Sequence, residues 1–414
     1  MRPRLVAGPL RQLLREFPIV IVTGPRQVGK TTLARAQQGR TYVTLDDVSA
    51  LEGARRDPEG FLGDLPRPVT LDEVQRVPEL VLVAKGAVDR RRRSGEFLFT
   101  GSARIGFGSD VTDSLAGRAA LLRARPLTWA EQDGRPAWNA VDVLFGARTP
   151  AALASRFAAT GRFDGARVMA GGLPVPMLRL RGGARARWFE QYRATYLERD
   201  VPALVRTDET GPLSRFVSLA AARTAQTTNI ADLAREAGVS GDTGRRWSGV
   251  LEATFLADLV TPWFRNIGKR LVKAPKLHFG DAGLAAHLVG ARTWSEALGS
   301  HVAGALLETL VAQHLLAFAA TASRPTAVHH YRTHAGAEVD FILARGSRLL
   351  PIEVKASVTV KGSELRGLRA FMADHRDEAP LGVVLYTGAV AVPMGGAVVA
   401  LPLHAVLGGM SNDA

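Results

Sequence analysis

Short strand-like runs and helix-like segments alternate along the first part of the chain. The strand-like runs are rich in apolar and β-branched residues and cover residues 18–22, 42–47, 69–73, 96–99 and 119–125. Short apolar runs of this kind are typical of strands that are buried on both faces, as in a parallel sheet between helices. We therefore expect an α/β domain with a parallel sheet.

The middle of the chain has a helical period instead. Asn229 begins a short segment with one apolar face, Gly238 marks a tight turn, and a second helix is expected over 242–253. Residues 255–260 then have the pattern of a strand. This order favours a helix-turn-helix followed by a wing, which is a winged-helix module.

The last part of the chain returns to strands. After an apolar helix over 301–319, strand-like runs cover 327–333, 337–344 and 348–355, and a helix over 362–375 and a strand over 381–387 follow. The order helix, three strands, helix, strand is that of the restriction-endonuclease core. The chain is too long for one core. We expect a P-loop α/β domain over 1–135, a helical linker or lid region over 136–212, the winged-helix-like module over 213–290 and a restriction-endonuclease-like α/β domain over 291–414.

A glycine-rich loop follows the first strand-like run. Its residues have the form G-x-x-x-x-G-K-T and are Gly24, Pro25, Arg26, Gln27, Val28, Gly29, Lys30 and Thr31, with Thr32 leading into a helix. Glycines allow successive N–H groups to point at phosphates, and the following helix directs its positive end at them. Lys30 is expected to reach the β- and γ-phosphates, and Thr31 to bind Mg²⁺. Strand, loop and helix occur in the required order, so we expect ATP and Mg²⁺ as cofactors.

Two adjacent acids end the third run. Asp72 and Glu73 have the form of a Walker B segment, in which the first acid holds the Mg²⁺ shell and the second polarises the attacking water. Ser102, or Thr100, at the end of the next run is a candidate sensor of the γ-phosphate, and an ordinary turn is the alternative. Arg118 is a candidate for stabilising transition-state charge in its own subunit or in a neighbour's, with a plain surface arginine as the alternative.

The C-terminal strands bear Asp340 and the triplet Glu353-Val354-Lys355. Residues two apart in a strand share a face, so Glu353 and Lys355 project together and the neighbouring strand can bring Asp340 beside them. Two carboxylates could then hold Mg²⁺ while the lysine steadies an attacking water. The set resembles the PD-(D/E)xK nuclease motif, with Glu308 as the acid from the first helix. The proline of the motif is missing, and a nuclease fold also serves as a binding scaffold.

The formal net charge of the chain is +14. Such an excess attracts polyanions and makes DNA an expected partner, but an arginine-rich composition alone gives the same charge. If the helix-turn-helix reads DNA, Thr243, Arg245 and Arg246 enter the major groove; the alternative is that the module packs against the ATPase. The chain has no cysteine, no apolar signal core and no evident run of about 18 apolar residues. We expect a cytoplasmic protein without a membrane partner.

Four segments together resemble one group of proteins. They are G-P-R-Q-V-G-K-T-T-L, T-L-D-E-V-Q-R-V-P-E-L, F-T-G-S-A and L-A-G-R-A. The group is the prokaryotic AAA+-like ATPases with an uncharacterised C-terminal domain, and the resemblance extends through residues 196–201 and 276–284. It implies an ATP-binding protein with Mg²⁺-dependent ATPase activity. Nucleotide-controlled binding or cleavage of nucleic acid stays open, as does a signalling or scaffold ATPase with a protein partner, and a homo-oligomer with arginine supplied in trans is compatible with either.

Overall fold

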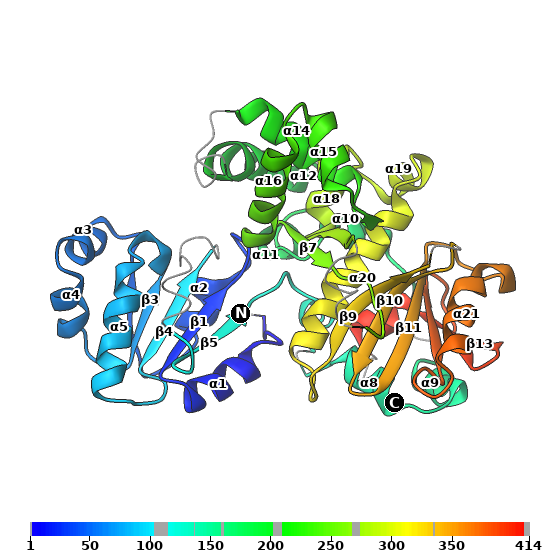
Figure 1. Cartoon of the computed structure of the whole chain (residues 1–414), viewed down its shortest axis with the longest axis horizontal. Coiled ribbons are helices and arrows are strands. Elements are labelled where there is room, and N and C mark those ends of the chain that lie inside the picture. Colours follow the sequence, from blue (N-terminus) through cyan, green and yellow to red (C-terminus); the bar gives the residue numbers. More distant parts are fainter. Residues whose placement is uncertain are drawn as a thin grey trace. The chain divides into compact units, whose positions relative to one another are not determined.

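The computed structural model of the protein describes residues 2–102, 115–135, 137–158, 161–201, 209–266, 274–333 and 336–409. The chain divides into two compact units (Figure 1). The first unit contains Arg4–Arg125 and Val250–Leu256, and the second contains Met1–Pro3, Pro126–Gly249 and Ala257–Ala414. The N-terminal part of the first unit thus ends near the predicted boundary at 135, whereas the rest of the chain, apart from Val250–Leu256, forms one unit.

A five-stranded parallel sheet with the order β2-β3-β4-β1-β5 forms the centre of the first unit. The predicted parallel sheet is therefore confirmed. The elements are α1 (Ala7–Glu16), β1 (Ile19–Thr23), α2 (Lys30–Arg35), β2 (Thr41–Thr44), α3 (Val48–Arg56), α4 (Pro58–Asp64), β3 (Val69–Asp72), η1 (Val74–Arg76), α5 (Glu79–Arg90), β4 (Phe97–Gly101) and β5 (Ala119–Arg123). Strand β4 lies between β1, which leads into the glycine-rich loop, and β3, which ends at Asp72.

Alternate residues of β1 face opposite sides of this sheet. Ile19 and Ile21 belong to a core that includes buried residues of α3, α4 and α5. Val20 and Val22 belong to a second core with buried residues of α1 and α2. Helices therefore cover both faces, which is why the strands are apolar throughout and not only at every second residue.

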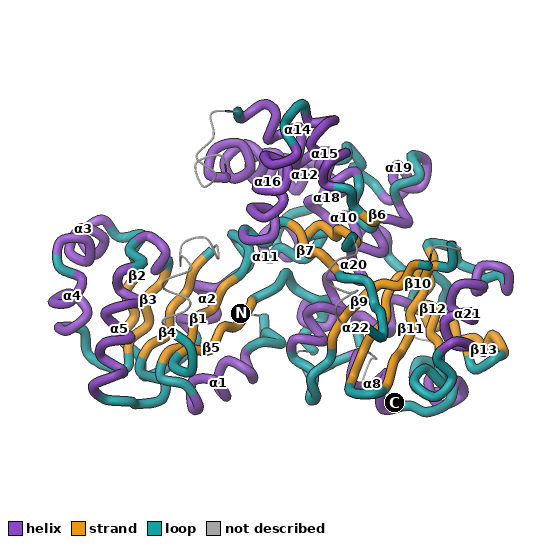
Figure 2. The backbone as a smooth tube through the Cα atoms, viewed as in Figure 1, coloured by secondary structure: helices purple, strands orange, loops and turns teal. Residues whose placement is uncertain are grey.

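The second unit contains two sheets, shown with their helices in Figure 2. Its elements up to the smaller sheet are α7 (Trp129–Gln132), α8 (Ala140–Gly146), α9 (Pro150–Arg156), α10 (Gly165–Ala170), α11 (Pro174–Leu178), α12 (Gly182–Tyr192), η3 (Arg193–Asp200), α14 (Thr210–Ala222), β6 (Gln226–Thr227), α15 (Ile230–Ala237), α16 (Gly241–Ala253), β7 (Ala257–Val260) and β8 (Lys276–Phe279). The last residues of α16 belong to the first unit.

The remaining elements follow the smaller sheet. They are α18 (Ala282–Leu288), α19 (Trp294–Gly299), α20 (Ala303–Ala320), β9 (Ala327–Arg332), β10 (Glu338–Arg345), β11 (Arg348–Lys355), η4 (Gly362–Leu365), α21 (Arg366–Asp374), β12 (Gly382–Tyr386), β13 (Val392–Gly395), β14 (Val398–Pro402) and α22 (Leu403–Gly408). The larger sheet has the order β13-β14-β12-β11-β10-β9. Strands β9, β10 and β11 pair antiparallel, and β12 pairs parallel with both β11 and β14.

The expected order of helix, three strands, helix and strand is present in this region as α20, β9, β10, β11, α21 and β12. Helix α20 packs on β9 and β11, and α21 packs on β10, β11 and β12. The predicted helix over 362–375 begins as the short 3₁₀ turn η4. Strands β13 and β14 extend the sheet beyond the sequence-based expectation, and α22 follows them.

The region expected to be a linker or lid packs on the C-terminal sheet and its helices. Trp138 Nε1 donates a hydrogen bond to Val406 O at 2.9 Å. Asn139 Nδ2 donates to Phe318 O at 2.8 Å. These contacts over long sequence separations explain why residues after 126 belong to the second compact unit.

The helix-turn-helix segment is built as its sequence suggests. The Asn229 side chain accepts a hydrogen bond from Ala231 N and caps α15, and Gly238 ends that helix with φ 81°. The order α14, β6, α15, α16, β7 and β8 leads to a three-stranded antiparallel sheet, β6-β8-β7. The strand β8 was not predicted separately and proves central to a polar cluster described below.

Helix α20 is long and apolar enough to cross a membrane by length and composition alone. The sequence has no unbroken run of about 18 apolar residues here, because four polar residues interrupt the segment, and the helix meets the criterion by its mean hydropathy. The four polar residues are Glu308, Thr309, Gln313 and His314. Within the described chain 67% of the helix is buried, as in the core helix of a soluble protein. Its polar side chains have protein partners, among them Lys276 for Glu308 and Thr224 for Thr309.

Candidate functional site

The glycine-rich loop connects the carboxyl end of β1 to α2. At Gly24, φ is 150° and a Cβ atom would lie 2.2 Å from the carbonyl oxygen of Ala124. Any side chain at this position would collide with the backbone. Gly29 has φ 94° and comes directly before the first residue of α2, Lys30. The two glycines thus give the loop its tight path, as the motif requires.

Lys30 is folded back over its own loop. Its Nζ donates to Gly24 O at 3.1 Å and to Pro25 O at 3.0 Å, and the side chain is 4% exposed. Burial lowers the pKa of Lys30 to about 8, although the nearby carboxylates of Glu73 and Asp72 oppose this shift. The ammonium is held by neutral carbonyl groups, so anionic phosphate oxygens would be stronger partners.

Asp72 is the centre of a hydrogen-bond network. Its Oδ2 accepts from Thr31 Oγ1 at 2.8 Å and from Tyr42 Oη at 2.7 Å, and its Oδ1 accepts from Thr100 Oγ1. The Asp72 side chain is buried. Mg²⁺ in nucleotide sites is held by one or two carboxylates or hydroxyls together with phosphates and waters. The donor set of Thr31 and Asp72 fits that ion.

Glu73 adopts a left-handed backbone conformation with φ 59°. Such a conformation in a residue other than glycine costs on the order of 1–3 kcal/mol and often occurs at functional sites. Its N–H donates to Thr100 Oγ1 at 3.1 Å. Its Oε2 accepts from Ser102 Oγ at 3.3 Å and from Gln75 Nε2. The backbone turn and the two side-chain donors together fix the direction of this carboxylate.

Both sensor candidates lie beside the acids, in different places. Thr100 contacts Asp72 and the backbone of Glu73, whereas Ser102 contacts the Glu73 carboxylate and, at 3.1 Å, Gln75 Nε2. The residues directly after Ser102 lie outside the described part of the chain. Strand order explains the arrangement, because β4 lies next to β3 and their carboxyl ends share an edge.

Sequence reasoning missed two members of this network, Tyr42 and Gln75. Tyr42 was expected only as part of a strand, and its contact with Asp72 depends on β2 being the neighbour of β3. Gln75 lies in the turn η1, and its position two residues after Glu73 gives no sequence signal. Both contacts follow from the sheet order and the turn, neither of which a single motif shows.

Arg118 lies at the other end of the sheet. Its carbonyl accepts from Ile19 N, and it directly precedes Ala119, the partner of Ile19 at the amino end of β1. The glycine-rich loop starts at the carboxyl end, about 13 Å further along the strand at 3.3 Å per residue. Arg118 Nε pairs with Asp89 Oδ1 at 2.5 Å. The structure does not bring Arg118 to the loop of its own subunit, and a role toward a neighbouring subunit stays a prediction.

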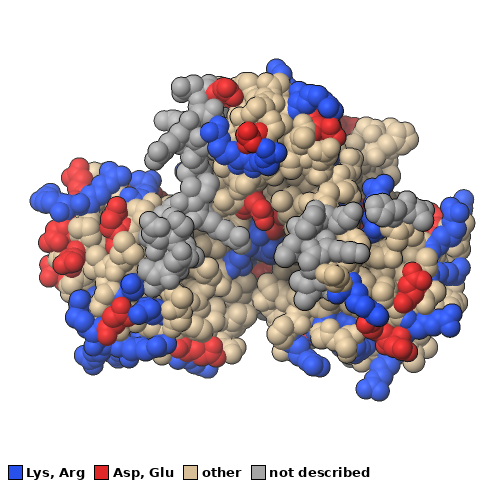
Figure 3. Space-filling model, in the orientation of Figure 1, with Lys and Arg blue, Asp and Glu red and all other residues tan. Residues whose placement is uncertain are grey.

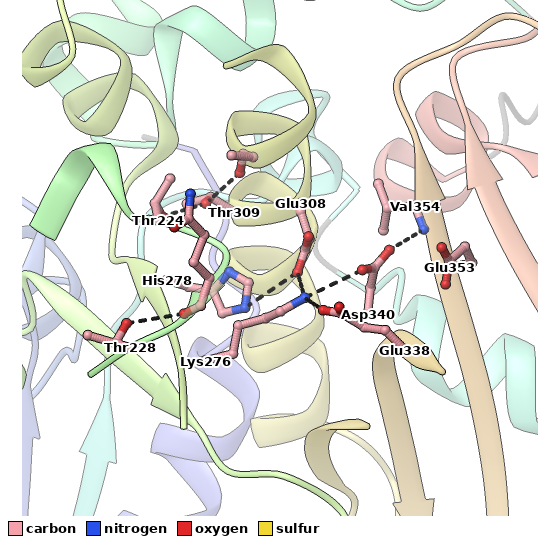
Figure 4. A network of polar contacts seen from close by, with 12 residues as sticks. Thr224, Thr228, Lys276, His278, Glu308, Thr309, Glu338, Asp340, Glu353 and Val354 are labelled. Carbon is pink, nitrogen blue, oxygen red and sulfur yellow. Dashed lines mark hydrogen bonds and ion pairs between the residues drawn. The ribbon is translucent and has the colours of Figure 1, made fainter. Parts of the chain in front are cut away.

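The second unit brings the C-terminal acids together, with a lysine among them (Figure 4). Lys276 Nζ lies 2.7 Å from Glu308 Oε1, 3.0 Å from Glu338 Oε1 and 3.5 Å from Asp340 Oδ1. Burial lowers the pKa of Lys276, but these carboxylates outweigh burial and the net shift is upward. Burial and Asp340 raise the pKa of Glu308 well above its usual value.

Glu353 and Lys355 share a face of β11, as the strand period predicted. Lys355 Nζ donates to Glu353 Oε1 at 2.8 Å, while Glu353 Oε2 is buried and has no hydrogen-bond partner among the described residues. Burial and the Asp340 charge raise the pKa of Glu353 to about 8. In the described part of the chain no group of three His, Cys, Asp or Glu side chains is placed to hold a metal ion.

The sheet order, the loop after β1 and the acids after β3 define the class of the first unit as a P-loop ATPase. A family profile described as "AAA domain" matches residues 16–132. Two further profiles, described as domains of unknown function DUF8612 and DUF4143, match residues 166–295 and 303–406. The first unit is thus an AAA-type nucleotide-binding domain. The descriptions of the two profiles that match the second unit name no function.

Relatives exist over almost the full length. An uncharacterized protein of Mycobacterium tuberculosis is 31% identical over 411 residues, which is 98% of this chain and 84% of the relative. An uncharacterized protein of Mycobacterium bovis matches with the same figures of 31%, 98% and 84%. The chain belongs to the family of these proteins. A shikimate kinase of Psychrobacter arcticus is 33% identical over 124 residues, covering 28% of this chain and 66% of the kinase.

Two solved structures are similar in part. The Walker-type ATPase PABY2304 of Pyrococcus abyssi covers 68% of this chain and 94% of its own, with 13% identity and a TM-score of 0.39. Protein VC1899 of Vibrio cholerae covers 94% of this chain and 95% of its own, with 12% identity and a TM-score of 0.19. The fold assignment therefore depends on the sheet order and on the AAA profile.

Proposed function

We propose that the protein hydrolyses ATP to ADP and phosphate in a Mg²⁺-dependent reaction at the glycine-rich loop. One observation carries this proposal: Thr31 Oγ1 donates to Asp72 Oδ2 at 2.8 Å. A hydroxyl from the loop and a carboxylate from β3 thereby meet where a nucleotide-bound ion is held in P-loop ATPases. Glu73, the next residue after Asp72, is oriented separately by Ser102 and Gln75.

Each residue has one role in this reaction. Lys30 leaves the carbonyl groups of Gly24 and Pro25 and neutralises charge on the β- and γ-phosphates. Thr31 and Asp72 would hold Mg²⁺, which would supply positive charge to offset the charge that develops on the phosphate oxygens. Glu73 orients the attacking water and accepts its proton. Ser102, through its contact with Glu73, reports the state of the γ-phosphate to that carboxylate.

Nucleotide binding by three variants tests these roles. Lys30→Ala should lose ATP binding, because the variant lacks the point charge on the phosphates. Asp72→Asn should bind ATP but lose the difference between Mg²⁺ and EDTA that the wild type shows. Arg15→Ala, on the exposed face of α1, is the control. Unchanged ATP affinity in Lys30→Ala would contradict the assignment of the loop.

A second candidate function is DNA binding by the helix-turn-helix, which we propose as a winged-helix module. Arg245 and Arg246 on α16 are exposed, and Arg245 forms an ion pair with its exposed neighbour Asp242. Thr243 instead shares a hydrogen bond with Ser240 at the start of the helix. On the face drawn in Figure 3, Lys and Arg side chains are spread among acidic ones and do not gather in a single stripe. The exposed pair on α16 is thus the observation that favours this function.

For the C-terminal sheet we propose a restriction-endonuclease-like fold, supported by the order from α20 to β12 and by the convergence of Glu308, Asp340 and Glu353. Two functions were open for such a domain. One is cleavage of nucleic acid, and the other is binding of a protein partner by an inactive scaffold, as in a signalling ATPase. Metal-dependent cleavage of nucleic acid by the purified protein would separate them.

A further inference from the structure

The acid cluster of the second unit surrounds a cation that is part of the chain, Lys276. The three carboxylate contacts of Lys276, at 2.7, 3.0 and 3.5 Å, match the three N–H donors of an ammonium. Mg²⁺ takes oxygen ligands at about 2.0–2.1 Å and carries two positive charges. An ion at this place would overlap the ammonium and be repelled by it, so Mg²⁺ does not fit while Lys276 is present.

Both oxygens of Asp340 have a partner within the second unit. Asp340 Oδ1 faces Lys276, and Oδ2 accepts from Val354 N at 2.8 Å. The register of β10 against β9 shifts between Val339 and Ile342, and this irregularity contains Asp340. Such irregularities re-aim side chains. Asp340 is thereby held by the lysine and by a backbone amide, and a divalent ion shared with Glu353 would meet the positive charge of Lys276, 3.5 Å from Asp340 Oδ1.

Lys276 is fixed in position by its strand. It is the first residue of β8 and is 2% exposed. Its neighbour Leu277 pairs with Gln226 of β6 and Leu259 of β7. His278, also buried in β8, lies 3.9 Å from Glu308 and has its pKa lowered to about 3 by burial and by Lys276, so it stays neutral. Lys276 therefore reaches the acids from a strand that is paired on both sides.

We infer that Lys276 is the resident cation of the Glu308, Glu338 and Asp340 cluster, where it takes the place of a divalent ion and joins β8 to α20 and β10. The cluster then connects these elements by ion pairs within the second unit and is buried except at Glu338, whose side chain is 38% exposed. In this account the chain has no metal-dependent nuclease centre at these residues. The inference does not depend on the proposed ATPase, because none of its residues belongs to the first unit.

Mn²⁺ binding by full-length protein without nucleotide tests the inference, with electron paramagnetic resonance to count bound ions. When Lys276 is present, the single substitution Asp340→Asn should leave the number of bound Mn²⁺ ions the same as in the wild type. Lys276→Met should gain one ion per chain, bound at least about tenfold more tightly than any ion in the wild type, because a buried positive charge has been removed. The added Asp340→Asn change should abolish that gain.

Two further variants serve as controls. Lys276→Arg keeps a cation and should gain no Mn²⁺ site, and Lys361→Met removes an exposed lysine of the same unit and should behave as wild type. A wild-type Mn²⁺ ion that Asp340→Asn removes would overturn the inference, as would a folded Lys276→Met that gains none. If Lys276→Met does not fold, the comparison of wild type with Asp340→Asn decides the question.

Discussion

At the scale of single residues, the charged side chains of the nucleotide site are hydrogen-bonded to neutral groups of the protein. Lys30 is bound by two carbonyl oxygens, Asp72 by hydroxyl groups, and Glu73 by Ser102 and Gln75. Each charged group therefore has a neutral partner that a nucleotide or its ion can replace. Preformed partners of this kind keep the groups oriented before the substrate arrives, which reduces the reorganisation that binding requires.

The pKa of Lys30 leads to a pH dependence of nucleotide binding. Since burial lowers this pKa to about 8, the charged form is lost as pH rises through that value. ATP affinity should be constant below pH about 7 and fall by up to about tenfold per pH unit above pH about 8. Calorimetric titration between pH 7 and 9 measures this effect. Lys30→Arg keeps its charge and should show a flat profile; the same fall in that variant would assign the titration to another group.

Thr100 gives a second test at this scale. Its hydroxyl donates to Asp72 and accepts from Glu73 N, and the residue is fully buried. Thr100→Val should lower the free energy of unfolding of the first unit by about 1–3 kcal/mol, because the buried Asp72 carboxylate loses a donor and the half-buried Glu73 amide loses its acceptor. Thr100→Ser should keep most of the stability. The relevant transition in a urea titration is the one that nucleotide shifts; equal stability of the two variants would contradict this role.

The sequence predicted the members of the nucleotide site that belong to a contiguous motif. Lys30, Thr31, Asp72 and Glu73 each follow a strand, and the carboxyl ends of parallel strands share an edge. Lys276 could not be found in this way. It is far in sequence from the acids that it contacts, and it belongs to a strand whose partners are set by the three-stranded sheet.

At the scale of elements, the sequence predicted helix α20 but not the contacts that its polar side chains make with other segments. Its apolar composition indicates a buried helix, which the structure has. Its polar residues each connect it to a different segment: Glu308 to β8, Thr309 to Thr224, and His314 Nε2 to Trp129 N at 2.8 Å. Burial lowers the pKa of His314 to about 3, so the ring accepts that hydrogen bond in its neutral form.

The proposed DNA binding by helix α16 can be tested at Arg245 and Arg246. If Arg245 and Arg246 bind phosphates, their double substitution by alanine should weaken binding to duplex DNA and reduce the slope of log affinity against log salt by about 0.9 for each phosphate that is no longer neutralised. The double variant Arg11→Ala and Arg15→Ala removes two exposed arginines of α1 and is the matched control. Fluorescence anisotropy at several salt concentrations gives both values. Equal weakening in the two double variants would assign DNA binding to the overall charge of +14.

At the scale of the whole molecule, the chain forms two compact units where four domains were expected. The strand and helix patterns in the sequence identified most elements of the two larger sheets. The spacing of hydrophobic residues could show these elements because it depends on which side of each element is buried. The patterns did not show that residues after 126 pack on the C-terminal sheet, since contacts such as Trp138 with Val406 join segments far apart in sequence. Domain boundaries depend on such contacts, which leave no local pattern.

Hydrolysis by Glu73→Gln is the measurement that tests the central claim most directly. Phosphate release at saturating ATP and Mg²⁺ is followed together with ATP binding in the same preparation. The amide keeps the shape of Glu73 but cannot accept a proton, so binding should remain within about threefold of the wild type while turnover falls by about 10²-fold or more. Turnover at the wild-type rate with binding intact would contradict the assignment of Glu73, and no hydrolysis by the wild type itself would contradict the proposed ATPase.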